Sequence, residues 1–301
     1  MGPPGVDARN VATLRWYAAN QAGVRFPTEP NPVGIAFDGR DVWISNAQIT
    51  SNQSTDSILK LNSADGGQQK KVNVGAGARG LAYDGGYVWV AVSSTNAVVK
   101  VRASDGTKIG TYSVGSHPFG VAFDGASIWV TNSGDGTVTK LRESDGFVQG
   151  TFVVGGQPMG IACDEENVWV ANQLDDTVTK LRASDGALQG TYPVGDAPIA
   201  LAFDGTHMWV VNQSADTVTK LLASDGSTAG TYAVGNGPRG IVFDGGRIWV
   251  TNEIDDTVTK ILARDGSVLG TYAVGNQPFG IAFDGMDIWV VNYGSDTASK
   301  L

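Results

Sequence analysis

The sequence predicts an all-β fold, a seven-bladed β-propeller in which each blade is a four-stranded antiparallel sheet. Three observations support this prediction: a repeated unit of about 40 residues, four strand-like segments in each unit, and turn residues between them. One such sheet has two apolar faces, and stacking seven of them around an axis covers both. The repeat is marked by one tryptophan in each copy, at Trp43, Trp89, Trp129, Trp169, Trp209, Trp249 and Trp289.

Within each unit, four short segments are rich in Val, Ile, Thr, Tyr or Trp and have the length of strands. In the sixth copy they are residues 239–243, 247–251, 257–261 and 269–274. The segments between them, "DGG", "NEIDD", "ARDGS" and, before the next copy, "GNGP"-like loops, are rich in residues that favour turns. Each unit is therefore predicted to be an antiparallel meander.

The innermost strand of each blade alternates small and large residues. In the third copy, Gly120 and Ala122 lie on one face of the strand, and Val121 and Phe123 lie on the other. We expect the nearly bare face to receive a bulky side chain of a neighbouring blade, the tryptophan of its second strand. The repeated lysines, from Lys60 through Lys300, are expected to pair across blades.

The two ends of the chain are predicted to share the seventh blade. The last copy stops in its third strand, and "AGVRFPTEPNPVGIAFDG" near the start aligns with "LGTYAVGNQPFGIAFDG" before the seventh tryptophan. Residues 22–28 are therefore expected to form the outer strand of that blade, which removes two exposed sheet edges. The chain divides into an N-terminal segment, residues 1–21, and a single propeller domain, residues 22–301. A rough apolar face over residues 7–19 predicts a short helix.

Charge and composition disfavour several classes of partner. The net charge is −9 and Lys and Arg form no run, so we expect neither a nucleic-acid partner nor an anionic membrane surface. No apolar stretch approaches the roughly 18 residues of a membrane span. The first residues lack the pattern of a secretory signal, which favours a cytoplasmic protein unless a leader has been removed. Cys163 is the only cysteine, so an internal disulfide is excluded and a small core residue is expected. We expect a monomer.

The phrase "IAFDGxxIWVTNxxDDTVTKL" resembles the YVTN and NHL groups of bacterial β-propeller repeats, over residues 22–301. The blades are also similar to those of the streptogramin (virginiamycin B) lyases, and that likeness implies a magnesium-dependent lyase using His and Glu near a central channel. This sequence departs from that pattern, because its second strands end mostly in Asn rather than Glu and its only histidines are His117 and His207. Related propellers serve as enzymes, sensors, adhesion modules and scaffolds, so the fold does not decide the function.

One face of the disc is expected to carry the functional site. The second-to-third loops and the blade-to-blade loops share this face, and by resemblance propeller ligands bind at the channel mouth on this side. Asparagines at the ends of the second strands are candidate ligand residues there, or they bond to nearby backbone and fix the hairpin. They are Asn46, Asn132, Asn172, Asn212, Asn252 and Asn292.

The residue that opens the innermost strand at the channel mouth differs between copies. It reads Val33, Arg79, Phe119, Met159, Ile199, Arg239 and Phe279. Two arginines, two phenylalanines and a methionine could receive an anionic or amphipathic small molecule, a peptide end or a protein partner. Alternatively, arginine is simply tolerated at a solvated rim. A six-residue insertion in the first blade, within "NAQITSNQSTDS", lies on the same face and is either a recognition loop or a drifted loop.

Candidate catalytic residues also fall on this face. His117 in the third blade, and Glu253 and Asp255 in the sixth, could act as a base and a carboxylate pair across the mouth. No loop collects the five or more oxygen ligands that calcium prefers, and no Gly-rich phosphate loop opens a helix. The sequence therefore predicts no metal and no cofactor.

These observations predict a non-catalytic binding or interaction propeller, with its ligand or partner at the channel mouth. Two alternatives stay open. The first is a magnesium-dependent lyase or hydrolase, similar to streptogramin lyase and working at the same mouth. The second is a sugar-binding propeller with one site in each blade, which is disfavoured because the repeated residues are typical of turn and core positions.

Overall fold

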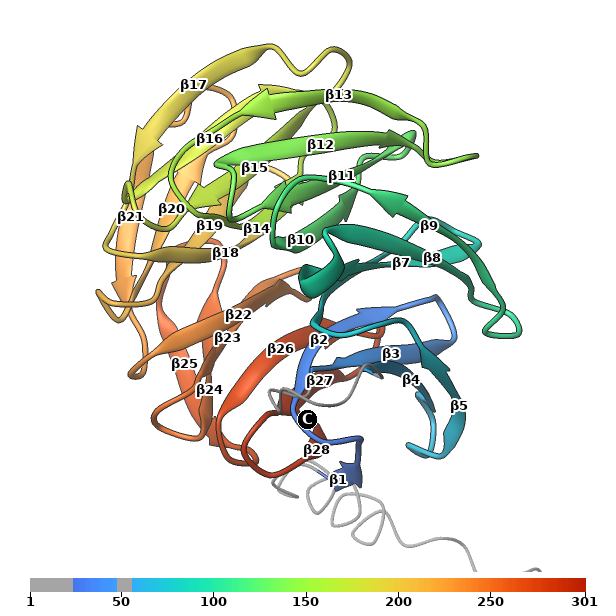
Figure 1. Cartoon of the computed structure of the whole chain (residues 1–301). Helices are drawn as coiled ribbons and strands as arrows, with labels where there is room; N and C mark the ends of the chain where they lie inside the picture. The colour runs from blue at the N-terminus through green and yellow to red at the C-terminus, as the bar shows by residue number, and fades with distance from the viewer. Residues whose placement is uncertain (1–23, 48–55) are drawn as a thin grey trace, which may run out of the picture.

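The computed structural model describes residues 24–47 and 56–301, which form 28 strands in seven separate four-stranded antiparallel sheets (Figure 1). The sheets are arranged as blades around a central axis, which confirms the predicted seven-bladed propeller. A turn of 3-10 helix at Ser93–Thr95 is the only helix within these ranges. No helix in the described part of the chain is long and apolar enough to cross a membrane.

In six blades the strands follow one another in chain order, with the first strand nearest the axis. The first three of these blades comprise β2 (Pro32–Phe37), β3 (Asp41–Asn46), β4 (Ser57–Asn62) and β5 (Gln68–Asn73); β6 (Ala78–Tyr83), β7 (Tyr87–Val92), β8 (Ala97–Arg102) and β9 (Lys108–Ser113); and β10 (Pro118–Phe123), β11 (Ser127–Asn132), β12 (Thr137–Arg142) and β13 (Val148–Val153). The next three comprise β14 (Pro158–Cys163), β15 (Asn167–Asn172), β16 (Thr177–Arg182) and β17 (Leu188–Pro193); β18 (Pro198–Phe203), β19 (His207–Asn212), β20 (Thr217–Leu222) and β21 (Thr228–Ala233); and β22 (Pro238–Phe243), β23 (Arg247–Asn252), β24 (Thr257–Leu262) and β25 (Val268–Ala273).

The seventh blade takes strands from both ends of the chain. Its first three strands are β26 (Pro278–Phe283), β27 (Ile288–Asn292) and β28 (Thr297–Lys300), and its fourth is β1 (Val24–Pro27). β1 pairs antiparallel with β28, with Val24 opposite Lys300 and Pro27 opposite Thr297. Figure 1 shows β1, in blue, beside the red β28. β1 thus occupies the position predicted for the outer strand. The helix predicted at residues 7–19, and residues 48–55 of the first-blade insertion, lie outside the described residues.

Each blade buries a tryptophan whose indole N–H is satisfied by the aspartate of the preceding turn. Trp129 is fully buried, and its Nε1 donates to Oδ2 of Asp124 at 2.7 Å. Oδ1 of the same carboxylate accepts from the backbone N–H groups of Ala126 and Ser127. The equivalent bond from tryptophan to aspartate recurs in all seven blades at 2.7–2.9 Å. One repeated residue therefore closes a turn and also satisfies a buried donor.

The tryptophans do not cover the bare face of the innermost strand, contrary to the prediction. Trp129 lies opposite Ala122, so the tryptophan and the small residues share one face of the sheet. A Cβ on Gly120 would instead lie 2.6 Å from the carbonyl oxygen of Met159 in the next blade. Glycine therefore lets neighbouring innermost strands approach each other closely. Trp129 packs against the branched residues of the next blade, namely Val168, Val170 and Leu181.

A lysine on the third strand connects most blades to the next one. Lys220 donates from Nζ to the carbonyl oxygen of Ala263 at 2.7 Å, and Nζ lies 4.9 Å from the centroid of the Trp209 ring. Lys260 makes no such bond among the described residues, because the third and fourth strands of the following blade come from opposite ends of the chain. The predicted pairing across blades is thus confirmed with a backbone acceptor at six positions, Lys60, Lys100, Lys140, Lys180, Lys220 and Lys300.

Candidate functional site

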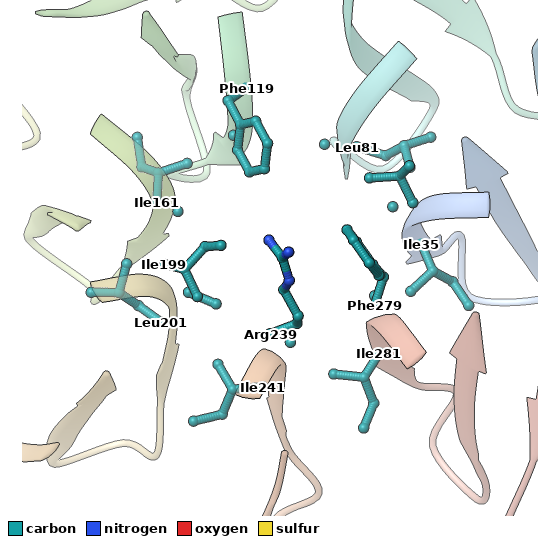
Figure 2. Close-up of a pocket in the computed structure, with 18 of the residues that line it drawn as sticks. Ile35, Leu81, Phe119, Ile161, Ile199, Leu201, Arg239, Ile241, Phe279 and Ile281 are labelled. Carbon is teal, nitrogen blue, oxygen red and sulfur yellow. The ribbon is translucent and has the colours of Figure 1, made fainter. Parts of the chain in front are cut away.

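The first strands of the seven blades enclose a cavity of about 240 Å³ on the axis of the propeller. Figure 2 shows it surrounded by aliphatic side chains from different strands. Its wall is mainly apolar, and its volume is below the roughly 300–1,000 Å³ of pockets that enclose drug-sized ligands. The cavity therefore suits a small apolar group, or the end of a larger molecule. Each blade contributes one aliphatic residue to this wall, the set being Ile35, Leu81, Val121, Ile161, Leu201, Ile241 and Ile281.

Most of the varying residues predicted at the channel mouth line this cavity, but two of them do not. Met159 is only 9% exposed and packs in a core cluster with Trp209 and Ile241. Arg79 is half-buried and lies outside the lining. The cavity thus has one arginine in its described lining, where the sequence predicted two. The five residues that do line it are Val33, Phe119, Ile199, Arg239 and Phe279.

Arg239 brings a charge into this apolar cavity, and that charge is compensated. Its Nε lies 2.5 Å from Oε2 of Glu253, and its guanidinium carbon lies 4.5 Å from the centroid of the Phe279 ring. When the side-chain amide of Gln213 turns its oxygen toward the guanidinium, that oxygen accepts hydrogen bonds at 3.1–3.3 Å. Figure 2 shows Arg239 reaching from β22 toward Phe119, beside Phe279.

The partners of Arg239 occupy a position that the sequence analysis did not assign to ligand binding. Gln213 and Glu253 each follow the asparagine that ends a second strand, and so does Tyr293. The Tyr293 ring stacks on Phe279 with 5.0 Å between centroids and 28° between planes. The signal was present, because this position also varies between copies. It reads Ala47, Ser93, Ser133, Gln173, Gln213, Glu253 and Tyr293.

The candidate asparagines stand apart from the cavity lining and are occupied by bonds within the propeller. Asn132 is fully buried, and its Nδ2 donates to the hydroxyls of Thr137 and Thr139 at 3.0 and 2.9 Å. Its Oδ1 accepts from the backbone N–H of Gly115 at 3.0 Å. The structure therefore supports the hairpin-fixing alternative, and we leave the asparagines out of the ligand site. Asn46 is also buried, but its Nδ2 donates to the carbonyl oxygen of Glu29 at 2.7 Å. The remaining four candidates are equally buried and bond to the hydroxyls of their own third strands: Asn172, Asn212, Asn252 and Asn292.

The candidate catalytic residues do not come together in the cavity lining. His117 is exposed with φ of 51°, and its backbone N–H donates to Oδ1 of Asn96, so it serves as a turn residue between blades. Glu253 is paired with Arg239. Hydrogen bonds from the backbone and the side-chain amide of Asn236 lower the pKa of Asp255, which therefore also serves a turn.

No group of three His, Cys, Asp or Glu side chains within residues 24–47 and 56–301 is arranged to hold a metal ion. The expected absence of a metal and a cofactor remains a prediction. Cys163 is partly buried against a core cluster, and burial raises the pKa of its thiol.

Comparisons with known proteins show what the chain is similar to. No family profile and no curated protein matches it. A solved streptogramin B lyase is 20% identical, with 93% of this chain and 95% of that one covered and a TM-score of 0.74. Virginiamycin B lyase from Staphylococcus aureus is 17% identical, with 92% and 97% covered and a TM-score of 0.74. Hydrazine synthase from Kuenenia stuttgartiensis is 16% identical, with 94% and 98% covered and a TM-score of 0.76.

The distant similarity to the lyase propellers, inferred from the blade motifs, is thereby confirmed. At these identities the likeness shows the fold alone. The closer resemblance to the YVTN and NHL repeats and the bacterial origin that it implies stay predictions.

Proposed function

We propose that this propeller is a non-catalytic binding protein, whose site is the mouth of the central channel. Its ligand is a small amphipathic molecule, or an end of similar chemistry on a peptide or protein. The observation that supports this proposal is an apolar cavity with one charge-compensated arginine in its described lining. An apolar group would occupy the ring of aliphatic side chains, and a polar end would lie against Arg239.

The magnitude of the apolar term sets the expected affinity. Burial of one methylene contributes about 0.8 kcal/mol, so the chain of an eight-carbon probe such as octanamide contributes about 5 kcal/mol. Association itself costs at least about 4 kcal/mol in lost freedom of motion. These two terms leave about 1 kcal/mol, which by itself corresponds to a dissociation constant of roughly 0.2 M. A hydrogen bond from the polar end of the probe to the charged Arg239 contributes about 1.5–3 kcal/mol more, so simple probes are expected to bind with dissociation constants of about 1–15 mM. The natural ligand would bind more tightly through its polar end.

The two alternative functions receive less support from the geometry. A lyase would need its histidine and glutamate near the channel, but His117 lies in an exposed turn and Glu253 is held by Arg239. A sugar site in every blade would need repeated polar side chains that face solvent. The repeated Asn252 and Asp244 are instead committed to bonds within their own blade.

The proposal is tested with three eight-carbon probes, 1-octanol, octanamide and octanoate. Saturation-transfer NMR and calorimetry would measure their binding to the full chain. We expect at least one probe to bind saturably, with one site per chain. Phe119→Ala should weaken binding roughly fivefold, because the loss of an apolar contact of about 1 kcal/mol corresponds to a factor of that size. Phe147→Ala is the matched control, because Phe147 is 62% exposed and outside the cavity lining. If no probe binds, or if both variants weaken binding equally, the proposed site is wrong.

A further inference from the structure

The polar end of the ligand can be specified from the contacts of Arg239, an inference that rests on the proposed function. We propose that the site selects a neutral group that both donates and accepts a hydrogen bond, such as a primary carboxamide or a hydroxyl. It discriminates against a carboxylate. The two arginines of the sequence had favoured an anionic or amphipathic ligand, and the structure leads to the neutral amphipathic class.

The first argument is the compensation of charge at the site. The side chains of Arg239 and Glu253 are 26% and 18% exposed, so water screens this ion pair only in part. A charge-assisted bond of 2.5 Å between Nε and Oε2 brings the two groups into direct contact. The pair therefore carries no net charge, although only Arg239 of the two lines the cavity. A ligand anion gains little from it.

The second argument is the hydrogen-bonding capacity that the pair leaves open. A guanidinium has five N–H donors, and the bond to Glu253 uses the one on Nε. Gln213 offers a single oxygen to the guanidinium, which leaves donors on the terminal nitrogens. Oε1 of Glu253 has no partner among the described residues and remains an acceptor. Glu253 lies outside the cavity lining, but its pairing with Arg239 places this oxygen close to the guanidinium, so a carboxamide bound to a terminal nitrogen of Arg239 could also donate to it.

The third argument is the cost of a carboxylate at the same place. A carboxylate has only acceptors, so it leaves Oε1 of Glu253 unsatisfied and places a second negative charge beside the first. A carboxylate that bonds to the free terminal nitrogens would therefore place two negative charges against one arginine, which disfavours its charged form. The other arginine of the mouth, Arg79, lies outside the cavity lining and is not placed to offset that charge by direct contact.

The fourth argument is that the arginine is held in place before a ligand binds. Its guanidinium lies on the face of Phe279, and that ring is in turn stacked on Tyr293. Displacing Glu253 from this arrangement would give up a contact that already exists. A neutral ligand uses the arrangement as it stands, so it keeps the benefit of preorganisation.

The test compares octanamide with octanoate by calorimetry at neutral pH, in the full-length wild type, in Glu253→Gln and in Arg79→Gln. We expect the wild type to bind octanamide at least about tenfold more tightly than octanoate. Glu253→Gln frees the charge of Arg239 while keeping the shape of the side chain, and it should reverse the order. Arg79→Gln is the matched control and should bind both probes as the wild type does.

Each outcome decides between the two proposals. A wild type that binds octanoate as tightly as octanamide overturns the inference but leaves the proposed site intact. An unchanged preference in Glu253→Gln also overturns it, because the discrimination then has another source. If the wild type binds neither these probes nor 1-octanol, the proposed function itself fails. Circular dichroism and thermal unfolding of each variant would show that the fold is retained.

Discussion

Replacing Lys220 by methionine tests how much the lysine contacts between blades stabilise the propeller. Lys220 is 5% exposed and donates to the carbonyl oxygen of Ala263 in the next blade. Its ammonium group also lies over Trp209. Methionine keeps an unbranched apolar side chain in the same space but removes the charge and the donor. The substitution therefore isolates the polar contact from the packing of the stem.

The expected cost can be worked from these contacts. A hydrogen bond that involves a charged group contributes about 1.5–3 kcal/mol, and a desolvated cation over an aromatic ring adds up to about 2 kcal/mol. Part of this loss of free energy is offset, because methionine has no ammonium group that must be desolvated on folding. We expect Lys220→Met to lower the free energy of unfolding by about 2 kcal/mol.

Lys260→Met is the matched control within the same chain. Lys260 lies over Trp249 but lacks a carbonyl acceptor among the described residues. Burial, with a smaller contribution from Arg247, lowers the pKa of Lys260, so its surroundings disfavour the charged form. Its replacement should therefore cost less than about 1 kcal/mol.

The measurement is equilibrium unfolding in urea, followed by tryptophan fluorescence, because the repeated tryptophans are nearly all fully buried. The two variants should have the same denaturant slope and different midpoints. Equal shifts of the two midpoints would refute the reasoning, because the bond to the next blade would then contribute nothing measurable.

Three further predictions concern packing, pH and thiol chemistry. Gly160→Ala should destabilise the protein by about 2 kcal/mol or more, because a Cβ there would lie 2.5 Å from the carbonyl oxygen of Ile199, whereas Gly246→Ala meets no atom within 4 Å and should be tolerated. Thermal unfolding would compare them, and equal melting temperatures would contradict the close approach of innermost strands. Burial raises the pKa of Asp204, but hydrogen bonds, first from Trp209 and then from backbone amides, outweigh burial and lower it below 3.8. The unfolded chain then binds more protons than the folded chain. The stabilisation that Asp204 gives the folded state is therefore complete above pH 3.8, and it is lost as the pH falls through the lower pKa of the folded protein. In urea unfolding, the free energy of unfolding of Asp204→Asn should fall less at acidic pH than that of the wild type. An identical fall in both proteins would contradict the stabilising role of the Asp204 carboxylate. Because burial raises the pKa of the Cys163 thiol, its reaction with a disulfide reagent should be at least about tenfold slower in native than in unfolded protein. Rapid labelling of native protein would show that the thiol is accessible.

The arrangement of blades could be predicted because its signals are local. Strand length, turn residues and the interval between tryptophans are properties of short segments, and they recur in seven copies. The seventh blade followed from the same reasoning, since the repeat truncated at Leu301 needed an outer strand and residues 24–27 supply it. The small-residue face of the innermost strand was predicted correctly. The tryptophan expected to cover that face does not do so, because the backbone of the next blade lies against it.

The composition of the site was predictable only in part. The mouth position was recognised because it varies on a constant scaffold, and Phe119, Arg239 and Phe279 do line the cavity. The same reasoning failed for Met159, which packs in the core, and for Arg79, which lies outside the lining. Variation shows where side chains are free to differ, but it does not show which way they point.

By itself, the sequence determined how many blades form, how each is built and where the ends of the described chain join. These features follow from backbone preferences and hydrophobic patterning, which act over a few residues at a time. Only the tertiary structure decided that Glu253 compensates Arg239, with Gln213 and Phe279 beside it. Arg239 and Glu253 come from one blade, and Gln213 and Phe279 come from its two neighbours. Their contacts depend on side-chain conformation and on the packing of three sheets around one axis. The charge of the site is therefore a property of the assembled propeller.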